Sequence, residues 1–268
     1  MINLLLNHKI FDKNPPILFD LGAGGDPKLD WKKLHRYSHI FKLDANKNIE
    51  DNKNKNSTII NEIVFDKKKK VNFNITKSVF CSSLLNPNME ELENWSFRNK
   101  FEIKRKLKVQ TKTLGQVIRE NKINKIDLIK LDLQGIDLKV FKSIPIKIRK
   151  KILLAEFEPG LYNFYKNEDK LSEILNFMEN DYSIEEFVFS SSIKSNYKLH
   201  NSFTFLQRKS LNLINKKTKF YTNISFLRKK KFLIKKDLRS ILLMLAILIL
   251  KKRYTEALEI VKKYSHID

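Results

Sequence analysis

The sequence predicts an α/β fold with a mainly parallel sheet, and three observations support this prediction. Short apolar strands alternate with helical segments over most of the 268 residues. The first of these strands, Ile17–Phe19, runs through an acidic residue into a glycine turn, an order typical of the first strand of an open α/β sheet. At the end of the pattern two strands follow each other directly, which indicates an antiparallel hairpin at the sheet edge.

The composition is that of a folded protein with one sizeable core. Hydrophobic residues make up 42% of the chain and aromatic residues 11%, and the length suits one α/β domain with an appendage. The single Cys81 excludes a disulfide framework and a zinc–cysteine site. Met1–His8 lacks a basic region followed by a long apolar core, so we expect a cytoplasmic protein.

The chain carries a formal net charge of +23, from 53 Lys and Arg against 30 Asp and Glu. Lysine, asparagine and isoleucine are abundant, as in proteins with AT-rich coding sequences, so composition explains part of this excess. A charged surface for anionic partners stays open as an alternative. Recognition of nucleic acid is disfavoured, because specific readers rely on the planar fork of arginine, which is scarce here.

Further elements follow from periodicity and turn residues. Thr113 is the expected N-cap of the second predicted helix. The predicted helices cover Trp31–Tyr37, Gly115–Asn121, Ile136–Ser143 and Leu171–Asn180. The predicted strands after the first cover Ile40–Leu43, Thr58–Phe65, Val71–Ile75, Phe101–Val109, Ile126–Leu133, Ile152–Phe157, Tyr182–Phe189 and Ser202–Leu206.

The glycine turn after the first strand is a candidate ligand site. Gly22, Gly24 and Gly25 can take backbone angles that side chains forbid, and they let a ligand approach the backbone closely. Asp20 only accepts hydrogen bonds when ionised, so it suits an amine or a hydroxyl and not a phosphate. Taken alone, the segment is also compatible with an ordinary glycine-rich loop.

Acidic residues end later strands of the same predicted sheet. Asp44 ends the second strand, 22 residues beyond Gly22, where one carboxylate can accept hydrogen bonds from both hydroxyls of a ribose. Asp132 ends the strand Ile126–Leu133 in the same way. Each of these acids could instead cap a helix or order a turn.

The segment 209–268 differs from the rest, with 16 basic and 4 acidic residues and therefore a charge of +12. Its apolar run Ile241–Leu250 is too short to span a bilayer, and Tyr254–Tyr264 follows with helical spacing. We expect a helical hairpin that packs on the main domain or on a partner. A basic amphipathic element on the inner membrane face is the alternative. The predicted domains are therefore residues 1–208 and a basic helical extension, 209–268.

Several motifs together resemble the FkbM-type S-adenosylmethionine-dependent methyltransferases over Pro15–Arg208. The most specific is Ile126–Lys142, with its strand, KxDxxG and following acid. The motifs are FDLGAGGDP, LDAN, SSLLNPN, KTLGQVI, IDLIKLDLQGIDLKVFK and EFEPGLY. The resemblance implies a Rossmann-like class I sheet of seven strands, the last one antiparallel, with helices on both faces.

The resemblance also implies the cofactor, S-adenosylmethionine, and the residues around it. The glycine stretch would hold its methionine end, Asp44 its ribose, and Asp132 would lie beside the methyl donor. The cofactor contacts implied are Asp20, Gly22, Ala23, Gly24, Gly25, Asp44, Ser83 and Asp132. The chain departs from the usual pattern at Asp26-Pro27, where many members have a further glycine, and at Gln134 and Asp137, where Glu is common.

These observations predict O-methylation of a glycan-like or small-molecule acceptor. A hydroxyl acceptor needs a base; Asp132 is the first candidate, followed by Glu156 and Glu158. The five histidines show no metal-ligand spacing, so no metal is expected.

Three other functions fit parts of the sequence less well. A dinucleotide-dependent oxidoreductase would need glycine at position 27, where Pro27 stands. Base methylation of nucleic acid is disfavoured, because Asp132-Leu133-Gln134-Gly135 replaces the proline-aromatic motif of amine-directed enzymes. An inactive binding or scaffold protein with a basic tail is the alternative from another class.

Overall fold

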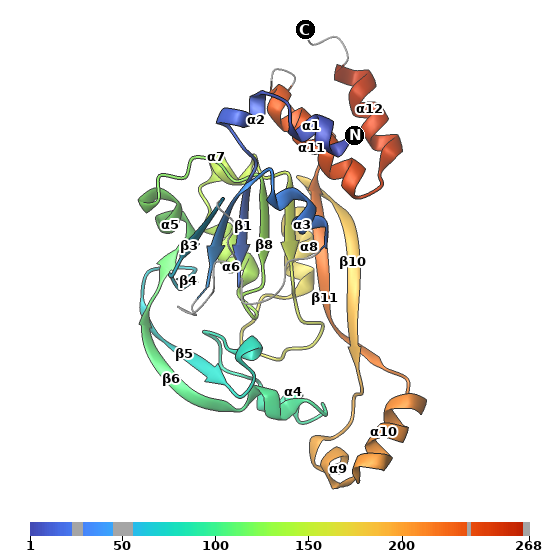
Figure 1. The fold of residues 1–268 in the computed structure, drawn as a ribbon. Coiled ribbons are helices and arrows are strands. Elements are labelled where there is room, and N and C mark those ends of the chain that lie inside the picture. Colours follow the sequence, from blue (N-terminus) through green and yellow to red (C-terminus); the bar gives the residue numbers. More distant parts are fainter. Residues whose placement is uncertain (23–28, 45–55, 235–236, 265–268) are drawn as a thin grey trace.

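The computed structural model describes residues 1–22, 29–44, 56–234 and 237–264 (Figure 1). Its centre is a seven-stranded sheet with the strand order β10-β11-β9-β8-β1-β2-β3. The strands are β1 (Ile17–Leu21), β2 (His39–Leu43), β3 (Ser57–Ile60), β8 (Leu128–Leu131), β9 (Leu154–Phe157), β10 (Tyr182–Ser192) and β11 (Thr218–Arg228). Neighbours from β3 to β9 pair in parallel, and β11 is antiparallel to both β9 and β10. The predicted fold class is therefore confirmed.

Smaller elements extend the carboxyl edge of this sheet (Figure 1). A long hairpin of β5 (Lys70–Thr76) and β6 (Ile103–Gln110) forms a second sheet, and β4 (Val64–Phe65) pairs with β7 (Lys112–Thr113). The predicted strand Thr58–Phe65 is thus two strands in different sheets. Between β5 and β6 lie η1 (Val79–Cys81), α4 (Met89–Leu92) and η2 (Arg98–Phe101).

Helices cover both faces of the main sheet. Thr113 caps the helix Leu114–Glu120 (α5) as predicted, because its side chain accepts a hydrogen bond from the backbone N–H of Gln116 in a capping box. Besides α4, the α-helices before β10 are α1 (Ile2–Leu6), α2 (Ile10–Lys13), α3 (Leu29–His35), α5 (Leu114–Glu120), α6 (Asp137–Lys142), α7 (Ile146–Arg149) and α8 (Leu171–Met178).

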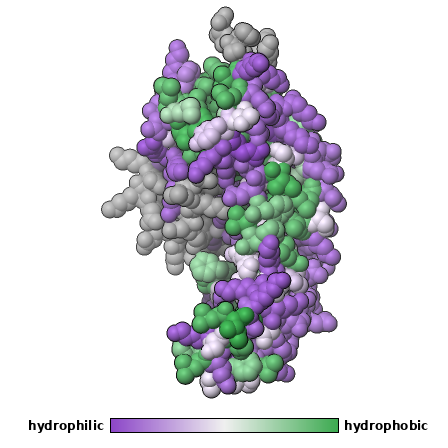
Figure 2. Space-filling view, turned by 90° about the vertical axis from the view of Figure 1, so that its right-hand side faces the viewer, coloured by the Kyte–Doolittle hydropathy of each residue, from purple (hydrophilic) through white to green (hydrophobic). Residues whose placement is uncertain are grey.

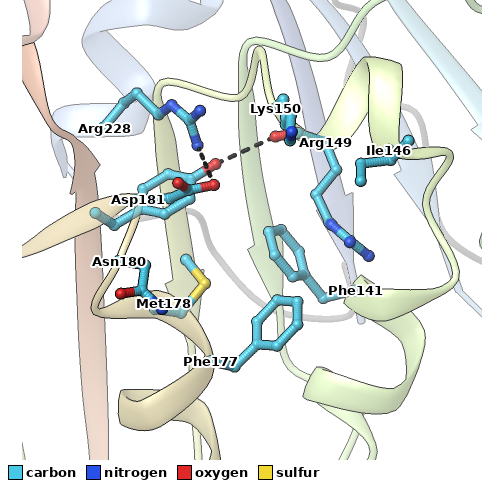
Figure 3. A pocket seen from close by; sticks show the side chains of 10 residues that line it. Phe141, Ile146, Arg149, Lys150, Phe177, Met178, Asn180, Asp181 and Arg228 are labelled. Atoms are coloured by element: carbon cyan, nitrogen blue, oxygen red, sulfur yellow. Dashed lines mark hydrogen bonds and ion pairs between the residues drawn. The ribbon is translucent and has the colours of Figure 1, made fainter. Parts of the chain in front are cut away.

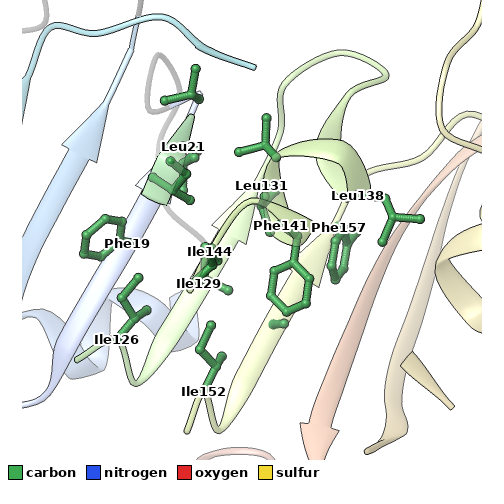
Figure 4. Packing of buried hydrophobic residues seen from close by; sticks show 14 of the residues in the cluster. Phe19, Leu21, Ile126, Ile129, Leu131, Leu138, Phe141, Ile144, Ile152 and Phe157 are labelled. Carbon is green, nitrogen blue, oxygen red and sulfur yellow. The ribbon is translucent and has the colours of Figure 1, made fainter. Parts of the chain in front are cut away.

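The larger core lies on the face that α5, α6 and α8 cover (Figure 4). Side chains alternate between the two faces of a strand, so Phe19 and Leu21 of β1 meet Ile129 and Leu131 of β8 on this side. Phe141 of α6 packs on them and its ring lies 5.2 Å from that of Phe157. Because the central strands are buried on both faces, they appear in the sequence as nearly continuous apolar runs.

The opposite face is covered by the C-terminal hairpin of α11 (Leu238–Leu250) and α12 (Tyr254–Tyr264), together with α1. Leu18, Leu128 and Leu154 of the sheet pack in this second core. Nine of the thirteen residues of α11 are buried, so this helix is part of the protein interior. The predicted two-helix hairpin is therefore confirmed. In the part of the chain that the structure describes, no helix is long and apolar enough to cross a membrane.

The predicted strand Ser202–Leu206 was wrong. Ser202 ends α9 (Tyr197–Ser202), and α10 (Phe205–Ile214) begins immediately after the cap residue Thr204, whose side chain accepts from the backbone N–H of Gln207. The seventh strand is β11, which the sequence placed in the basic extension. The predicted boundary at residue 208 therefore leaves one strand of the main sheet, β11, on the side of the extension.

Candidate functional site

The candidate site lies where β1, β8 and β9 end. These strands are adjacent and parallel, with Asp20 opposite Lys130 and Lys130 opposite Glu156 in the register. Their carboxyl ends consequently bring Asp20, Asp132 and Glu158 to one edge of the sheet. This is the edge at which open α/β sheets bind their ligands.

Gly22 connects the ends of three neighbouring strands. It adopts a positive φ of 77°, and its N–H donates to the carbonyl of Leu43 over 2.9 Å. A Cβ at this position would lie 2.1 Å from the carbonyl oxygen of Asp132, so only glycine fits. Asp44 is half-buried and directly follows Leu43, the residue whose carbonyl accepts from Gly22. Ala23, Gly24 and Gly25 lie outside the described residues.

Asp20 presents a buried acceptor at this edge. Asp20 is the penultimate residue of β1 and is 8% exposed. Within the described ranges Oδ1 has no hydrogen-bond partner, and Lys130 Nζ lies 3.6 Å from it. Burial raises the pKa of Asp20, while the charge of Lys130 opposes this shift.

Lys130 is a partly buried lysine between two carboxylates, a role that the sequence did not predict. Its Nζ also lies 3.7 Å from Asp132 Oδ2. Burial acts to lower the pKa of Lys130, but the charges of Asp20, Asp132, Glu158 and Glu156 together raise it. Lys130 is therefore a fixed positive charge behind the acids. A signal was present, since it is the single lysine inside the apolar strand IDLIKLDL.

Glu158 and Asp132 form a carboxyl pair. Burial, the charge of Asp132 and a hydrogen bond shared with Asp132 raise the pKa of Glu158 to about 8. Two acids this close hold one proton between them more readily than two charges. Gln134 Nε2 donates to Asp132 Oδ1 over 2.7 Å, and Asn223 Nδ2 donates to Glu158 Oε1 over 3.3 Å. At neutral pH the pair therefore keeps a proton.

Glu156 lies differently from Glu158. It is 2% exposed and stands one pleat back in β9, opposite Lys130 and Ser225. It therefore belongs to a polar row inside the sheet, whereas Glu158 lies against Asp132. Of the two glutamates predicted as bases, the structure brings Glu158 to Asp132.

Asp137 holds together the backbone segments that follow β8 and β9. Its Oδ1 accepts from the N–H of Leu133 over 2.8 Å and its Oδ2 from the N–H of Glu158 over 3.1 Å. Burial raises the pKa of Asp137 to about 7, partly offset by these two hydrogen bonds. One buried side chain thus ties the ends of β8 and β9 together.

Ser83 lies beside the site, but its hydroxyl holds a loop. Its Oγ donates to the carbonyl of Gln134 over 2.8 Å and accepts from the N–H of Leu85 over 3.0 Å. Gln134 has a positive φ of 53°, and the hydroxyl of Tyr165 lies 3.0 Å from its Oε1. Tyr165 thus orients the side-chain amide of Gln134, which in turn contacts Asp132. No pattern in the sequence pointed to this role of Tyr165.

A separate pocket lies at the opposite edge of the sheet, between α7, α8 and the outer strands (Figure 3). Arg228 donates to Asp181 over 3.0 Å there. The hydroxyl of Tyr182 donates to the carbonyl of Ile152 over 3.0 Å. None of the predicted site residues lines this pocket, so it is not part of the candidate site.

The sequence profile of the methyltransferase FkbM domain matches residues 27–186, more than half of the chain. The chain belongs to the FkbM methyltransferase family. Its fold and the family together indicate a methyltransferase. The matched segment includes Asp44, Ser83, Asp132 and Glu158, whereas the glycine turn begins before it. A search of curated proteins gives no significant match.

Proposed function

We propose that this FkbM-family protein is an S-adenosylmethionine-dependent methyltransferase that methylates a hydroxyl group of a glycan-like or small-molecule acceptor. The observation that carries this proposal is the meeting of Asp20, Gly22 and Asp132 at the carboxyl edge of the sheet. A buried acceptor without a hydrogen-bond partner lies there beside backbone that cannot accommodate a Cβ.

The residues present fit the cofactor. Its ammonium group would donate to Asp20 Oδ1, which supplies the acceptor that an amine needs. Its methionine part would lie against the backbone of Gly22, and Asp44 next to it would accept from the ribose hydroxyls. Ser83 remains a proposed contact, with one lone pair of its hydroxyl beyond the two hydrogen bonds it makes.

The bound cofactor supplies an electrophilic methyl group. The protein then has to align the acceptor oxygen, exclude water and take up a proton. The Asp132–Glu158 pair lies at the same edge and is the proposed proton acceptor. Asn223 and Gln134 orient the two carboxyl groups, and Lys130 balances their charge from behind. Glu156 is too far back in the sheet register to be the first choice.

Calorimetry with S-adenosylmethionine tests the cofactor half of this proposal. We expect Asp20→Asn and Asp44→Asn to weaken binding at least about tenfold, because each removes a charged acceptor worth ~1.5–3 kcal/mol. Asp66→Asn is the matched control, since Asp66 is exposed and pairs with Lys69 on the surface. Absence of binding at millimolar cofactor, or unchanged binding in both site variants, would contradict the proposal and favour a non-catalytic binding protein.

Incubation of the protein and labelled cofactor with hydroxyl-bearing acceptors tests the second half. The products are examined by mass spectrometry for a methyl ether. Transfer only to amines would contradict O-methylation while leaving cofactor binding intact.

A further inference from the structure

The connection between β10 and β11, residues 193–217, forms a helical projection of α9 and α10. The strands that carry it extend beyond the end of β9, because Ile224 of β11 already pairs with Phe157 while Thr218–Asn223 continue past it. The projection therefore lies on the carboxyl side of the sheet, the same side as the candidate site (Figure 1).

The helix α10 exposes large apolar side chains. None of its ten residues is buried, and Phe205 and Leu206 are 73% and 72% exposed. Leu213 is 80% exposed and shares their face by helical spacing, with Ile214, 77% exposed, at its margin. Such short helices are marginal in water without a packed face, so this face is expected to have a partner. Figure 2 shows the apolar area at the lower end of the molecule.

All charged residues of the same segment are basic. Residues 193–217 contain six Lys or Arg and no Asp or Glu: Lys194, Lys198, Arg208, Lys209, Lys216 and Lys217. Lys194 stacks on the rings of Trp95 and Tyr162 and thereby anchors the projection. Lys209 stands in the middle of the apolar face by helical spacing, and a lysine there can extend its ammonium past the apolar side chains to an anionic headgroup.

A second apolar protrusion lies near the site. Val79 and Phe80 of η1 are 69% and 67% exposed, and the chain continues from them into Ser83, which is bonded to Gln134. Two exposed apolar elements, η1 and α10, thus lie on the carboxyl side of the sheet, and η1 is the one joined to the candidate site through Ser83.

We propose that this carboxyl side of the molecule docks on an anionic lipid bilayer, led by the apolar and basic face of α10. Exposed large apolar residues combined with an uncompensated cluster of lysines match the requirements of an interfacial helix. Nucleic acid would match the lysines but would leave Phe205, Leu206 and Leu213 in water. A second copy of the chain would match the apolar face but would bring two basic segments together, which is unfavourable. Docking would turn the site toward the bilayer.

Vesicle co-sedimentation of the intact protein tests this proposal. We expect binding to vesicles containing phosphatidylglycerol and at least about tenfold weaker binding to phosphatidylcholine alone. Phe205→Ser/Leu206→Ser should weaken binding to the anionic vesicles by a similar factor, and so should Lys216→Glu/Lys217→Glu. Leu258→Ser/Val261→Ser is the control, because both residues are exposed on α12, away from the projection; its binding should be unchanged.

Circular dichroism and calorimetry with S-adenosylmethionine show that each variant is folded, and they keep this test separate from that of methyl transfer. Absence of binding to the anionic vesicles overturns the proposal. So does equal weakening by the α12 control. Two other results, each without vesicle binding, would assign the face to a different partner. Binding to a DNA or RNA duplex that only the lysine changes weaken would indicate nucleic acid. A dimer in light scattering that Phe205→Ser/Leu206→Ser dissociates would indicate a second copy of the chain.

Discussion

Arg239 of α11 and Asp127, immediately before β8, form a buried ion pair with two hydrogen bonds. Nη1 donates to Oδ1 over 2.8 Å and Nη2 to Oδ2 over 2.7 Å. The side chains are only 8% and 2% exposed. Arg239 also donates to the carbonyls of Asn14 and Pro15, and Asp127 accepts from the N–H of Ile17. The C-terminal hairpin is thereby tied to the two central strands of the sheet.

Loss of this arginine should strongly destabilise the protein. We expect Arg239→Met to lower the free energy of unfolding by about 3–5 kcal/mol, because it leaves the buried Asp127 charge uncompensated. Urea unfolding measures the change. Arg119→Met, at an exposed position of α5, should change it by less than ~0.5 kcal/mol. A similar small effect for both variants would show that the pair contributes little.

Methyl transfer should depend on the ionisation of Glu158. Its pKa is raised to about 8, so the carboxyl is protonated at neutral pH and becomes a base as the pH rises. We expect kcat/KM to increase with pH through an apparent pKa near 8, and Glu158→Gln to remove this step. Glu90→Gln, on the surface of α4, should keep it. A profile that is unchanged in Glu158→Gln would exclude this role.

The same group should make stability depend on pH in the opposite direction. The folded pKa of Glu158 lies above its ordinary value of 4.5, so folding takes up a proton between pH 4.5 and about 8. The stability linked to this proton is fully present below pH 4.5 and is lost as the pH rises toward 8. Urea unfolding at several pH values should show this decline, and Glu158→Gln should make it shallower. An equal slope in both proteins would contradict the assignment.

Lys130 should keep Asp20 ionised for the cofactor. Its charge lowers the pKa of Asp20 against the effect of burial, so Lys130→Met should raise that pKa further. Below the new pKa the ionised fraction falls about tenfold per pH unit, and cofactor affinity should fall with it in calorimetry. Lys130→Arg retains the charge and should bind more nearly as the native protein does. Equal losses in both variants at every pH would indicate a purely steric role.

Gly22 should not tolerate a side chain. Gly22→Ala would combine a positive φ, costing ~1–2 kcal/mol, with a Cβ 2.1 Å from the carbonyl oxygen of Asp132. We expect lower stability in thermal unfolding and at least a tenfold weaker cofactor affinity, because Asp132 must move. Native values for both quantities would show that the turn relaxes without cost.

The sequence by itself determined the parallel part of the fold and the acids at its edge. Leu18, Leu128 and Leu154 stand in apolar runs bounded by turn residues, and such runs predict buried strands whatever packs on them. Because parallel strands end at one edge, the sequence alone predicts that Asp20 and Asp132 lie close together. The cap Thr113 was equally readable, since its hydrogen bonds are local.

Only the tertiary structure decided the last strand, the pairing of the acids and the place of the C-terminal segment. The second half of β11, from Ile224 onward, is buried, with β9 and β10 on its two sides, although its surroundings in the sequence are basic. Whether Glu156 or Glu158 meets Asp132, and which carboxylates surround Lys130, depends on the register between strands that are distant in the sequence. Such contacts depend on where remote residues lie, and no local pattern carries that information.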